Sequence, residues 1–429
     1  MTIDITIQLQ KAQEQYKTWS RFTIERRLQS IETIKDFLLL NKKRLAHAIT
    51  TDMNKPISES IAEIEKCALL CEYYLKHAVD FLQEEIINSP WKKSYTRFSP
   101  MGVVLGIMPW NFPFWQVFRF AIPTLIVGNV VVLKHASNVP TCVQLLDEVF
   151  AQADTAIYFP IVVAGSEMES VIAHSIVKAV SFTGSEKAGR MVATTAGKYL
   201  KKCVLELGGS NAFIVLNDAD IEKTAKIAVK ARFLNSGQSC IAAKRFLIQR
   251  EKYDAFLAAF IKETKTLNIG DKYDAKTQFS EMAREDLAIE LETQLSKSVE
   301  QGATILLGGL RKGAYFEPTI VENIQTSMPL WKEETFGPVA PLQIFDTLED
   351  AIEMSNASEY GLGVSIFTKD ITSIQEHLFV FEEGTVFINE MVISYPSLPF
   401  AGIKNSGYGR ELSRWALYEF STVQTVVVS

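Results

Sequence analysis

The sequence lacks the features that mark several classes of protein. Only 5 of its 429 residues are cysteine, which is too few for a disulfide framework in a chain of this length. Its 44 Lys and Arg residues are outnumbered by 50 Asp and Glu, so it has no basic excess to support nucleic-acid binding. The first residues, MTIDITIQLQ, have neither the basic start nor the apolar centre of a signal peptide.

Long apolar runs are also missing. The most apolar stretch, 121–133, is interrupted by Pro123, Gly128 and Asn129 and is too short to cross a bilayer. These absences predict a cytoplasmic protein without a membrane or nucleic-acid partner. The composition, 47% hydrophobic and 22% charged, is normal for a protein with full cores, and 429 residues predict two or three domains.

Two of the five cysteines, Cys67 and Cys71, are four residues apart in a helical pattern of apolar side chains. Such a pair can be a metal or redox site, or two small apolar residues on a buried helix face. The apolar neighbours favour the second interpretation, so we expect no metal site. Two further cysteines also lie in apolar contexts, and only Cys240 has surroundings that do not suit a core residue.

Two kinds of pattern divide the chain. Up to about residue 85, apolar side chains recur every three or four residues, which predicts helices. Beyond that point, short apolar runs alternate with helical patterns, which predicts a parallel sheet with crossover helices. From residue 240 the alternation restarts as a second α/β domain, with helical stretches at 251–267 and 284–300. The apolar runs of the first part are 103–108, 130–133, 161–164, 179–182 and 203–205.

Polar or glycine-containing segments follow these apolar runs. In an open parallel sheet, ligands bind beyond the C-terminal ends of the strands, so we expect these segments to converge on one crevice. None of them contains a GxGxxG sequence, so the usual dinucleotide fingerprint is absent. The segments begin at Pro109, Lys134, Gly165, Thr183 and Glu206.

Two polar segments carry groups suited to covalent catalysis. Cys240 ends the turn Asn235-Ser236-Gly237-Gln238-Ser239-Cys240, and Glu206 begins the segment Glu206-Leu207-Gly208-Gly209-Ser210-Asn211. A cysteine in a polar, glycine-containing turn can be reached by a substrate, and a carboxylate beside two glycines can be approached closely by water. A thiolate that attacks and a carboxylate that activates the water of product release together form a covalent mechanism.

These motifs resemble the aldehyde dehydrogenase family, and the resemblance extends along most of the chain. Gly237-Gln238-Ser239-Cys240 is similar to the family's active-site signature, and Pro109-Trp110-Asn111-Phe112-Pro113 is similar to its oxyanion segment. The family implies an α/β fold with a Rossmann-like cofactor domain, an α/β catalytic domain and a small β oligomerisation arm. These parts are expected at 1–85 and 101–208, at 209–412, and at 86–100 and 413–429, in a homodimer or homotetramer paired partly through the β-prone tail 423–428.

The resemblance also implies the reaction. Cys240 is the expected nucleophile, and Asn111 with the backbone N–H of Cys240 is expected to bind the oxygen that becomes negative when the thiolate adds. Losing one such donor typically raises the activation free energy by about 3–4 kcal/mol. The thiohemiacetal then loses hydride to a nicotinamide and leaves a thioester, which Glu206 hydrolyses as general base. Family members that transfer the acyl group to coenzyme A usually lack this glutamate, so Glu206 implies release of a free carboxylic acid.

A nicotinamide cofactor is expected on the same grounds. Gly184 and Ser185, at a helix N-terminus, are expected to bind its pyrophosphate through backbone N–H groups. Relatives that prefer NAD often carry a glutamate at the position of Ser137, where it repels a 2′-phosphate, so we expect NADP to be preferred and NAD accepted. The segment 151–160 replaces the glycine- and proline-rich turn that normally borders the adenine. The full expected set of cofactor residues is Trp110, Lys134, Ser137, Gly184, Ser185, Leu207, Glu334 and Phe336.

The substrate residues are assigned by similarity to the succinate-semialdehyde dehydrogenase branch of the family. Trp115 and Arg119 are four residues apart on one predicted helix face. An arginine can hold a carboxylate with two parallel hydrogen bonds, so Arg119, with Ser239 and Ser397, is expected to bind the far carboxylate of the substrate. The alternative is that Arg119 belongs to a structural ion pair.

The expected reaction is therefore oxidation of succinate semialdehyde to succinate. Two alternatives stay open: a dehydrogenase for another aldehyde, such as glutarate semialdehyde or lactaldehyde, and a catalytically silent binding protein on the same fold. The intact Cys240, Glu206, Asn111 and Lys134 argue against the silent protein, because loss of function would be expected to change these residues first.

Overall fold

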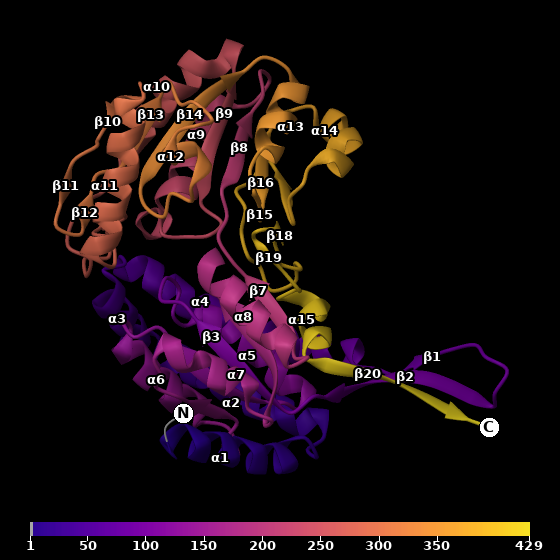
Figure 1. Cartoon of the computed structure of the whole chain (residues 1–429). Helices are drawn as coiled ribbons and strands as arrows, with labels where there is room; N and C mark the ends of the chain where they lie inside the picture. Colours follow the sequence, from indigo (N-terminus) through magenta and orange to yellow (C-terminus); the bar gives the residue numbers. More distant parts are fainter. Residues whose placement is uncertain (1–2) are drawn as a thin grey trace.

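The computed structural model describes residues 3–429 and has two lobes and a projecting arm (Figure 1). One lobe contains the N-terminal helices and a six-stranded sheet, and the other contains a seven-stranded sheet. A three-stranded sheet forms the arm. The predicted α/β class is confirmed.

The N-terminal part is helical, as the spacing of its apolar residues predicts. Thr23 caps the second helix, because its side chain accepts a hydrogen bond from the backbone N–H of Arg26. Asn54 ends the third helix in the left-handed region, at φ 57°, which asparagine tolerates. The helices are α1 (Ile3–Trp19), α2 (Ile24–Leu40), α3 (Lys42–Met53) and α4 (Ile57–Phe81).

Cys67 and Cys71 lie on the face of α4 that packs into the core of this lobe, and both are fully buried. They occupy that face as two small apolar residues. Within residues 3–429, no group of three or more His, Cys, Asp or Glu side chains could hold a metal ion.

The six-stranded sheet has the order β19-β7-β6-β3-β4-β5, and all neighbouring strands are parallel except β19 against β7. Every residue of β3 is buried, which explains why such strands appear in the sequence as continuous apolar runs. The strands are β3 (Val103–Met108), β4 (Val130–His135), β5 (Tyr158–Pro160), β6 (Val177–Thr183), β7 (Lys202–Glu206) and β19 (Gly407–Tyr408). The helices between them are α5 (Trp115–Val127), α6 (Pro140–Phe150), η1 (Gly165–Glu167), α7 (Met168–Ala173) and α8 (Glu186–Lys198).

One predicted strand is displaced. The apolar run 161–164 was expected to be a strand, but β5 ends at Pro160. Its last contact with β4 is the hydrogen bond from the backbone N–H of Ile161 to the carbonyl of Leu133 (2.9 Å). Beyond that bond the chain leaves the sheet, and Val162 is 90% exposed. The prediction was wrong because a short apolar run does not by itself fix which of its residues pair with the neighbouring strand.

The seven-stranded sheet has the order β10-β13-β14-β9-β8-β16-β17, and only β10 is antiparallel to its neighbour. Apolar side chains form one core on each face of it. Its strands are β8 (Asn211–Val215), β9 (Ala243–Gln249), β10 (Thr304–Leu307), β13 (Thr319–Glu322), β14 (Val339–Phe345), β16 (Val364–Phe367) and β17 (Val386–Ile388).

Helices cover both faces of this second sheet, and the predicted stretches 251–267 and 284–300 are largely helical. The helices are α9 (Ile221–Phe233), η2 (Leu234–Gly237), η3 (Arg250–Lys252), α10 (Tyr253–Thr264), α11 (Glu285–Glu300), α12 (Pro329–Lys332), α13 (Leu348–Asn356), α14 (Ile371–His377) and η4 (Leu378–Val380). Two small two-stranded antiparallel sheets accompany them, β11 (Arg311–Lys312) with β12 (Tyr315–Phe316) and β15 (Tyr360–Gly361) with β18 (Ile403–Lys404).

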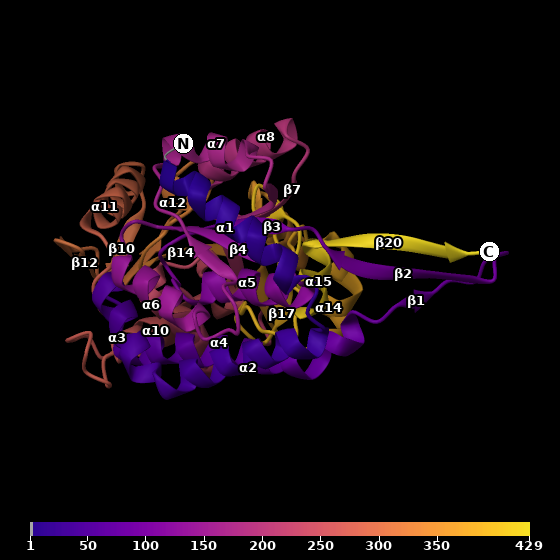
Figure 2. The ribbon, with the colours of Figure 1, turned by 90° about the horizontal axis from the view of Figure 1, so that it is seen from below.

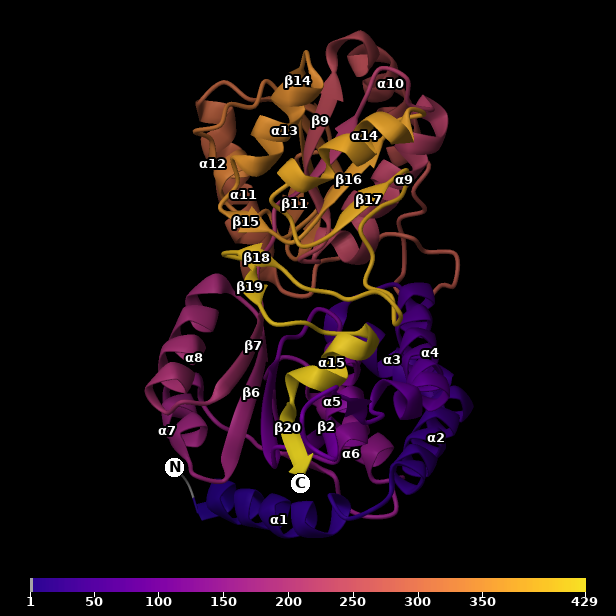
Figure 3. The same ribbon diagram turned by 90° about the vertical axis from the view of Figure 1, so that its right-hand side faces the viewer.

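The chain returns to the first lobe before its end (Figure 3). β19 pairs with β7, and the helix α15 (Ser413–Glu419) packs against α5. Phe400, Leu412 and Leu417 belong to the core of the first lobe. The expected catalytic domain, 209–412, therefore includes a final segment that packs with the first lobe.

The arm is made of β1 (Glu85–Ile86), β2 (Lys93–Pro100) and β20 (Ser421–Val428). β2 and β20 pair antiparallel from Lys93 opposite Val428 to Pro100 opposite Ser421, and the ribbon extends away from both lobes (Figure 2). The expected arm segment 413–429 is thus helical at its start and a strand only from Ser421. No helix within residues 3–429 is long and apolar enough to cross a membrane.

Candidate active site

Cys240 lies at the end of an irregular turn between α9 and β9, where the second lobe faces the first. Three residues of this turn have a positive φ: 52° at Asn235, 53° at Ser236 and 74° at Gly237. Gly237 is required there, because a Cβ would lie 2.5 Å from the carbonyl oxygen of Gly337. Hydrogen bonds hold the other two: the backbone N–H of Asn235 donates to Glu59, and the hydroxyl of Ser236 donates to the carbonyl of Ser280 (both 2.9 Å). The turn is thus fixed by its surroundings.

Asn111, a residue of the first lobe, forms hydrogen bonds with the same turn. Its side-chain Nδ2 donates to the carbonyl of Gln238 (3.2 Å), and its own carbonyl accepts from Nδ2 of Asn235 (2.9 Å). The side chain is buried, and its Oδ1 has no hydrogen-bond partner. The structure therefore brings the predicted oxyanion residue and the predicted nucleophile into one site.

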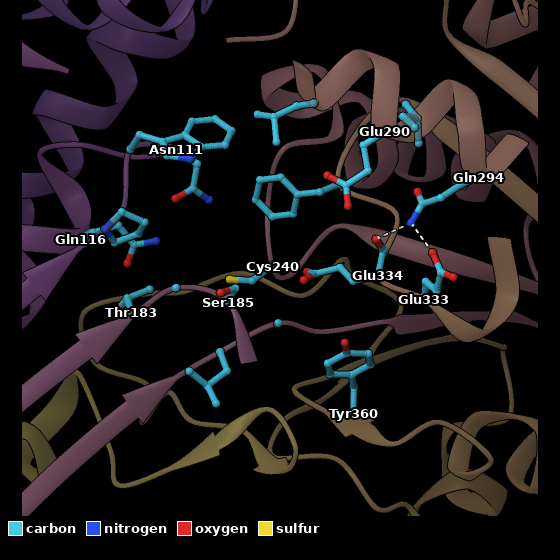
Figure 4. Close-up of a pocket in the computed structure, with 18 residues that line it drawn as sticks. Asn111, Gln116, Thr183, Ser185, Cys240, Glu290, Gln294, Glu333, Glu334 and Tyr360 are labelled. Carbon is cyan, nitrogen blue, oxygen red and sulfur yellow. Dashed lines mark hydrogen bonds between the residues drawn. The ribbon is translucent and has the colours of Figure 1, made fainter. Parts of the chain in front are cut away.

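Two cavities meet at Cys240. The larger, of about 380 Å³, lies between the lobes, and the smaller, of about 90 Å³, extends from Cys240 towards α4 and α5. Among residues 3–429, only Cys240 and Gln116 line both cavities. In the larger cavity, Cys240 lies between Asn111 and Gln116 on one side and Glu334 on the other (Figure 4). A sulfur atom in this position can contact a molecule in either cavity.

Cys240 is protonated at neutral pH in this environment. Burial raises the pKa of its thiol to about 11, and the carboxylates of Glu334 and Glu206 act in the same direction. Arg119 and Lys244 oppose this increase in the pKa. Only a small fraction of Cys240 is therefore thiolate at neutral pH, and this fraction increases as the pH rises towards 11.

The raised pKa of Cys240 predicts how its reactivity towards alkylating reagents depends on pH. Alkylation by iodoacetamide, an uncharged reagent that reacts with thiolates, should accelerate roughly tenfold for each pH unit from 7 to 10. The rate can be followed by mass spectrometry of the peptide that contains Cys240. An unperturbed thiol would level off near pH 8.5, so a plateau there would contradict the role of burial.

Glu206 ends β7 and lies opposite Gly407 of the antiparallel strand β19. Its side chain is buried, and neither carboxylate oxygen has a hydrogen-bond partner. Burial, and next the charge of Glu411, raise the pKa of Glu206 well above its ordinary value, although Arg119 and Arg410 act to lower it. It does not line either of the two cavities, so its predicted contact with the water of hydrolysis stays a prediction.

Several predicted cofactor residues line the larger cavity together. Trp110 and Phe336 contact each other edge to face, with ring centroids 5.7 Å apart. Gly184 and Ser185 line the cavity at the N-terminus of α8. The Ser185 side chain caps this helix by accepting a hydrogen bond from the backbone N–H of Ala188 (3.4 Å). Leu207 also lines the cavity. Together with Cys240, these residues form part of the wall of the larger cavity.

Glu334 is held in the same cavity by a residue that the sequence interpretation missed. Lys244 forms an ion pair with Glu334 and also donates to the carbonyls of Gly209 (2.6 Å) and Cys240 (3.2 Å). The backbone N–H of Gly209 donates to Glu334 as well (3.1 Å). The available signal was a lysine inside a strand that is otherwise buried, which requires a partner.

Lys134 and Ser137 lie outside this wall. Lys134 is in the last part of β4 and is partly buried, which lowers the pKa of its ammonium group. Ser137 is exposed, two residues after the end of β4. Neither is among the residues that line the larger cavity, so their contacts with a cofactor remain predictions.

The smaller cavity contains three of the four predicted substrate residues: Trp115, Arg119 and Ser239. Ser397 is exposed in the turn in which the N–H of Leu398 donates to the carbonyl of Tyr395, and it does not line this cavity. Ser394 takes its place, with its hydroxyl accepting from Nε1 of Trp115 (3.0 Å). The turn reverses the chain between the two serines, which sequence spacing alone could not reveal.

Arg119 already has a carboxylate partner within the protein. It forms an ion pair with Glu411, and both side chains are almost fully buried. Its Nη2 also lies 3.4 Å from the hydroxyl of Thr183. Arg119 lines the smaller cavity, but its charge is compensated within the protein, which corresponds to the structural alternative considered from the sequence.

Comparison with known proteins gives consistent matches along the chain. The aldehyde dehydrogenase family matches residues 2–426. A succinate semialdehyde dehydrogenase, NAD(P)+, of Escherichia coli K12 is 41% identical over 428 residues, which is 99% of this chain and 93% of that protein. A succinate-semialdehyde dehydrogenase, NADP(+), of Mycobacterium ulcerans is 40% identical and covers 95% of this chain and 90% of its own.

The solved structures agree with the sequence matches. The crystal structure of succinic semialdehyde dehydrogenase from Streptococcus pyogenes in complex with NADP+ superimposes with a TM-score of 0.96 at 34% identity. The superposition covers 100% of this chain and 96% of that one. On its fold, its site and these matches, the chain belongs to the aldehyde dehydrogenase family.

Proposed function

We propose that the protein oxidises succinate semialdehyde to succinate, with NADP as the preferred cofactor and NAD accepted. The observation that supports this most directly is the position of Cys240 where the two cavities meet. A sulfur that faces both a large and a small cavity can attack an aldehyde in one while the carbonyl carbon faces a cofactor in the other. The relatives named for succinate semialdehyde and NADP support the choice of substrate and cofactor.

The residues of the larger cavity fit a dinucleotide. The N-terminus of α8, at Gly184 and Ser185, would bind the pyrophosphate through backbone N–H groups, and Glu334 would accept hydrogen bonds from the nicotinamide ribose. Gly208 leaves room beside that carboxylate, because a Cβ there would lie only 2.4 Å from Oε2 of Glu334. The nicotinamide, when bound, supplies the hydride acceptor.

The remaining chemistry belongs to the protein. The thiolate of Cys240 adds to the aldehyde carbon, and the Asn111 amide stabilises the oxygen that becomes negative. Loss of hydride from that carbon gives a thioester on Cys240. Glu206 then takes a proton from the attacking water, and collapse of the tetrahedral species releases the carboxylic acid and the thiolate. The raised pKa of Glu206 makes its carboxylate a stronger base once it is ionised.

A panel of aldehydes tests this function. Initial rates with NADP should give the highest kcat/KM for succinate semialdehyde, compared with glutarate semialdehyde, lactaldehyde and butanal. A higher value for another aldehyde would replace the proposed substrate. Absence of any reduced cofactor with all four would identify the chain as a silent member of its family.

The cofactor preference is tested at Ser137. Ser137→Glu should shift the ratio of kcat/KM from NADP towards NAD, because a carboxylate repels a 2′-phosphate and accepts a hydrogen bond from a free 2′-hydroxyl. The repulsion is about 1–3 kcal/mol, or roughly 5- to 150-fold in the ratio. Ser137→Gln, of similar size but uncharged, is the matched control. An unchanged ratio in Ser137→Glu would mean that position 137 does not face the adenosine ribose.

We also propose that the protein is a homodimer or homotetramer assembled partly through the arm. β20 lies on the outside of the three-stranded sheet, and the apolar side chains of Val423, Val427 and Val428 on it are exposed. A strand of this kind presents unpaired backbone groups and apolar surface to a second chain. Sedimentation velocity of the full chain tests this, and a monomer at micromolar concentration would contradict it.

A further inference from the structure

We propose that Lys66, a residue of α4, is the cation that binds the far carboxylate of the substrate in the smaller cavity. This proposal rests on the proposed function, because it assigns the recognition of an aldehyde that carries a carboxylate. It transfers to Lys66 the contact that the sequence assigned to Arg119.

Lys66 reaches the cavity from α4. Its Nζ donates to the hydroxyl of Ser394 (2.8 Å) and lies 4.2 Å from the centroid of the Trp115 ring. The Ser394 hydroxyl also accepts from Nε1 of Trp115. Lys66, Trp115 and Ser394 all line the cavity, as Cys240 does. A carboxylate bound at Lys66 would therefore occupy the cavity that leads to the nucleophile.

The charges around the cavity leave Lys66 without an acidic partner. The only charged side chains that line it among residues 3–429 are Lys66 and Arg119, and Arg119 pairs with Glu411. Glu63, one turn before Lys66 on α4, pairs instead with Lys55 (2.6 Å) and accepts from the backbone N–H of Phe114 (2.9 Å). No carboxylate of the described chain lies within ion-pair distance of Nζ of Lys66.

An ammonium group without an anionic partner in a confined, largely apolar cavity is costly unless an anion joins it. Apolar and aromatic side chains such as Phe112, Met391 and Phe400 form much of the cavity wall. A substrate with an aldehyde at one end and a carboxylate at the other meets both requirements of the site, a carbonyl carbon for Cys240 and a negative charge for Lys66. An uncharged aldehyde meets only the first.

The protonation of Lys66 adds a second readout. Burial lowers the pKa of its ammonium group to about 8, and the cations Arg119 of α5 and Lys55 before α4 act in the same direction. Cys67 and Glu63, both on α4, oppose this decrease in the pKa. Because only the ammonium form binds a carboxylate, the preference for carboxylated aldehydes should decrease as the pH rises through about 8.

The experiment compares wild type, Lys66→Met, Lys66→Arg and Lys76→Met with two pairs of aldehydes of equal chain length. The pairs are succinate semialdehyde with butanal and glutarate semialdehyde with pentanal. Lys76 is an exposed lysine on the same helix, so Lys76→Met removes the same charge away from the cavity. Thermal unfolding of each variant measures damage to the fold separately.

We expect Lys66→Met to lower kcat/KM for the carboxylated aldehyde by roughly 30-fold or more, because one partner of a desolvated charge pair is lost. The uncharged aldehyde, which has no carboxylate to leave unpaired, should change far less. Lys76→Met should leave the ratio of the two as in wild type. Lys66→Arg should restore much of the ratio and remove its decrease above pH 8, because a guanidinium stays protonated.

Three outcomes separate the proposals. If wild type prefers succinate semialdehyde and Lys66→Met keeps that preference, Lys66 is not the anchor and the proposed function stands. If wild type prefers glutarate semialdehyde and Lys66→Met loses that preference, the anchor stands and the proposed substrate fails. If wild type has no preference for either carboxylated aldehyde, both are overturned.

Discussion

Cys240→Ala is expected to lower the rate of aldehyde oxidation by at least about 10⁴-fold, because covalent addition to the aldehyde becomes impossible. The substitution removes one sulfur atom from the point where the two cavities meet and leaves the wall of the larger cavity in place. Binding of NADP, measured by fluorescence titration, should therefore be nearly unchanged. Loss of both activity and cofactor binding would instead indicate a collapsed site.

Cys203→Ala is the matched control for that experiment. Cys203 is buried in β7 and lines neither cavity, so its removal tests the effect of losing a thiol elsewhere in the chain. The control should retain turnover. Residual activity of Cys240→Ala within roughly tenfold of wild type would rule out the covalent mechanism.

Glu206→Gln is expected to separate the two halves of the reaction. Hydride transfer does not need the base, so the variant should still give a burst of reduced cofactor equal to the number of active sites. Steady-state turnover should then be slower by about 10²- to 10⁴-fold, because the thioester waits for an unassisted water. Stopped-flow absorbance measures the burst, and the mass of the intact protein should reveal the acyl group on Cys240.

The pH dependence of the second half-reaction follows from the environment of Glu206. Burial and Glu411 raise its pKa, so the carboxyl group is protonated at low pH and hydrolysis of the thioester should accelerate as the pH rises and the proton is lost. Glu206→Gln should lose this acceleration. A variant without a burst would place Glu206 in the first half-reaction, and one with normal turnover would remove it from the mechanism.

The convergence of polar segments on one crevice was predictable in principle, but only part of it is found. The segments after β3, β6 and β7 contribute Trp110, Gly184 and Leu207 to the larger cavity. Those that begin at Lys134, near the end of β4, and at Gly165, after β5, do not line it. The strand order places β7, β6 and β3 side by side and β4 and β5 farther out, and this order is not written in any local pattern.

The arrangement of charges shows the same limit. The sequence offered two interpretations of Arg119, and a carboxylate far along the chain, Glu411, favours the structural one. The sequence gives no sign that Lys66 faces a cavity, because a single lysine on an amphipathic helix is normally solvated. Ser394 was missed because Ser397 stands three residues later and the turn between them exposes one and buries the other.

The sequence by itself determined the family and the chemistry expected of this protein. Cys240, Asn111 and the segments around Gly184 and Glu206 are short contiguous motifs, and their meaning depends on residue types that lie side by side in the chain. Only the tertiary structure decided that, among the charged side chains of residues 3–429 that line the smaller cavity, Arg119 has a carboxylate partner and Lys66 does not. That decision depends on pairs such as Arg119 with Glu411, whose attraction falls with distance in space and is independent of separation along the chain.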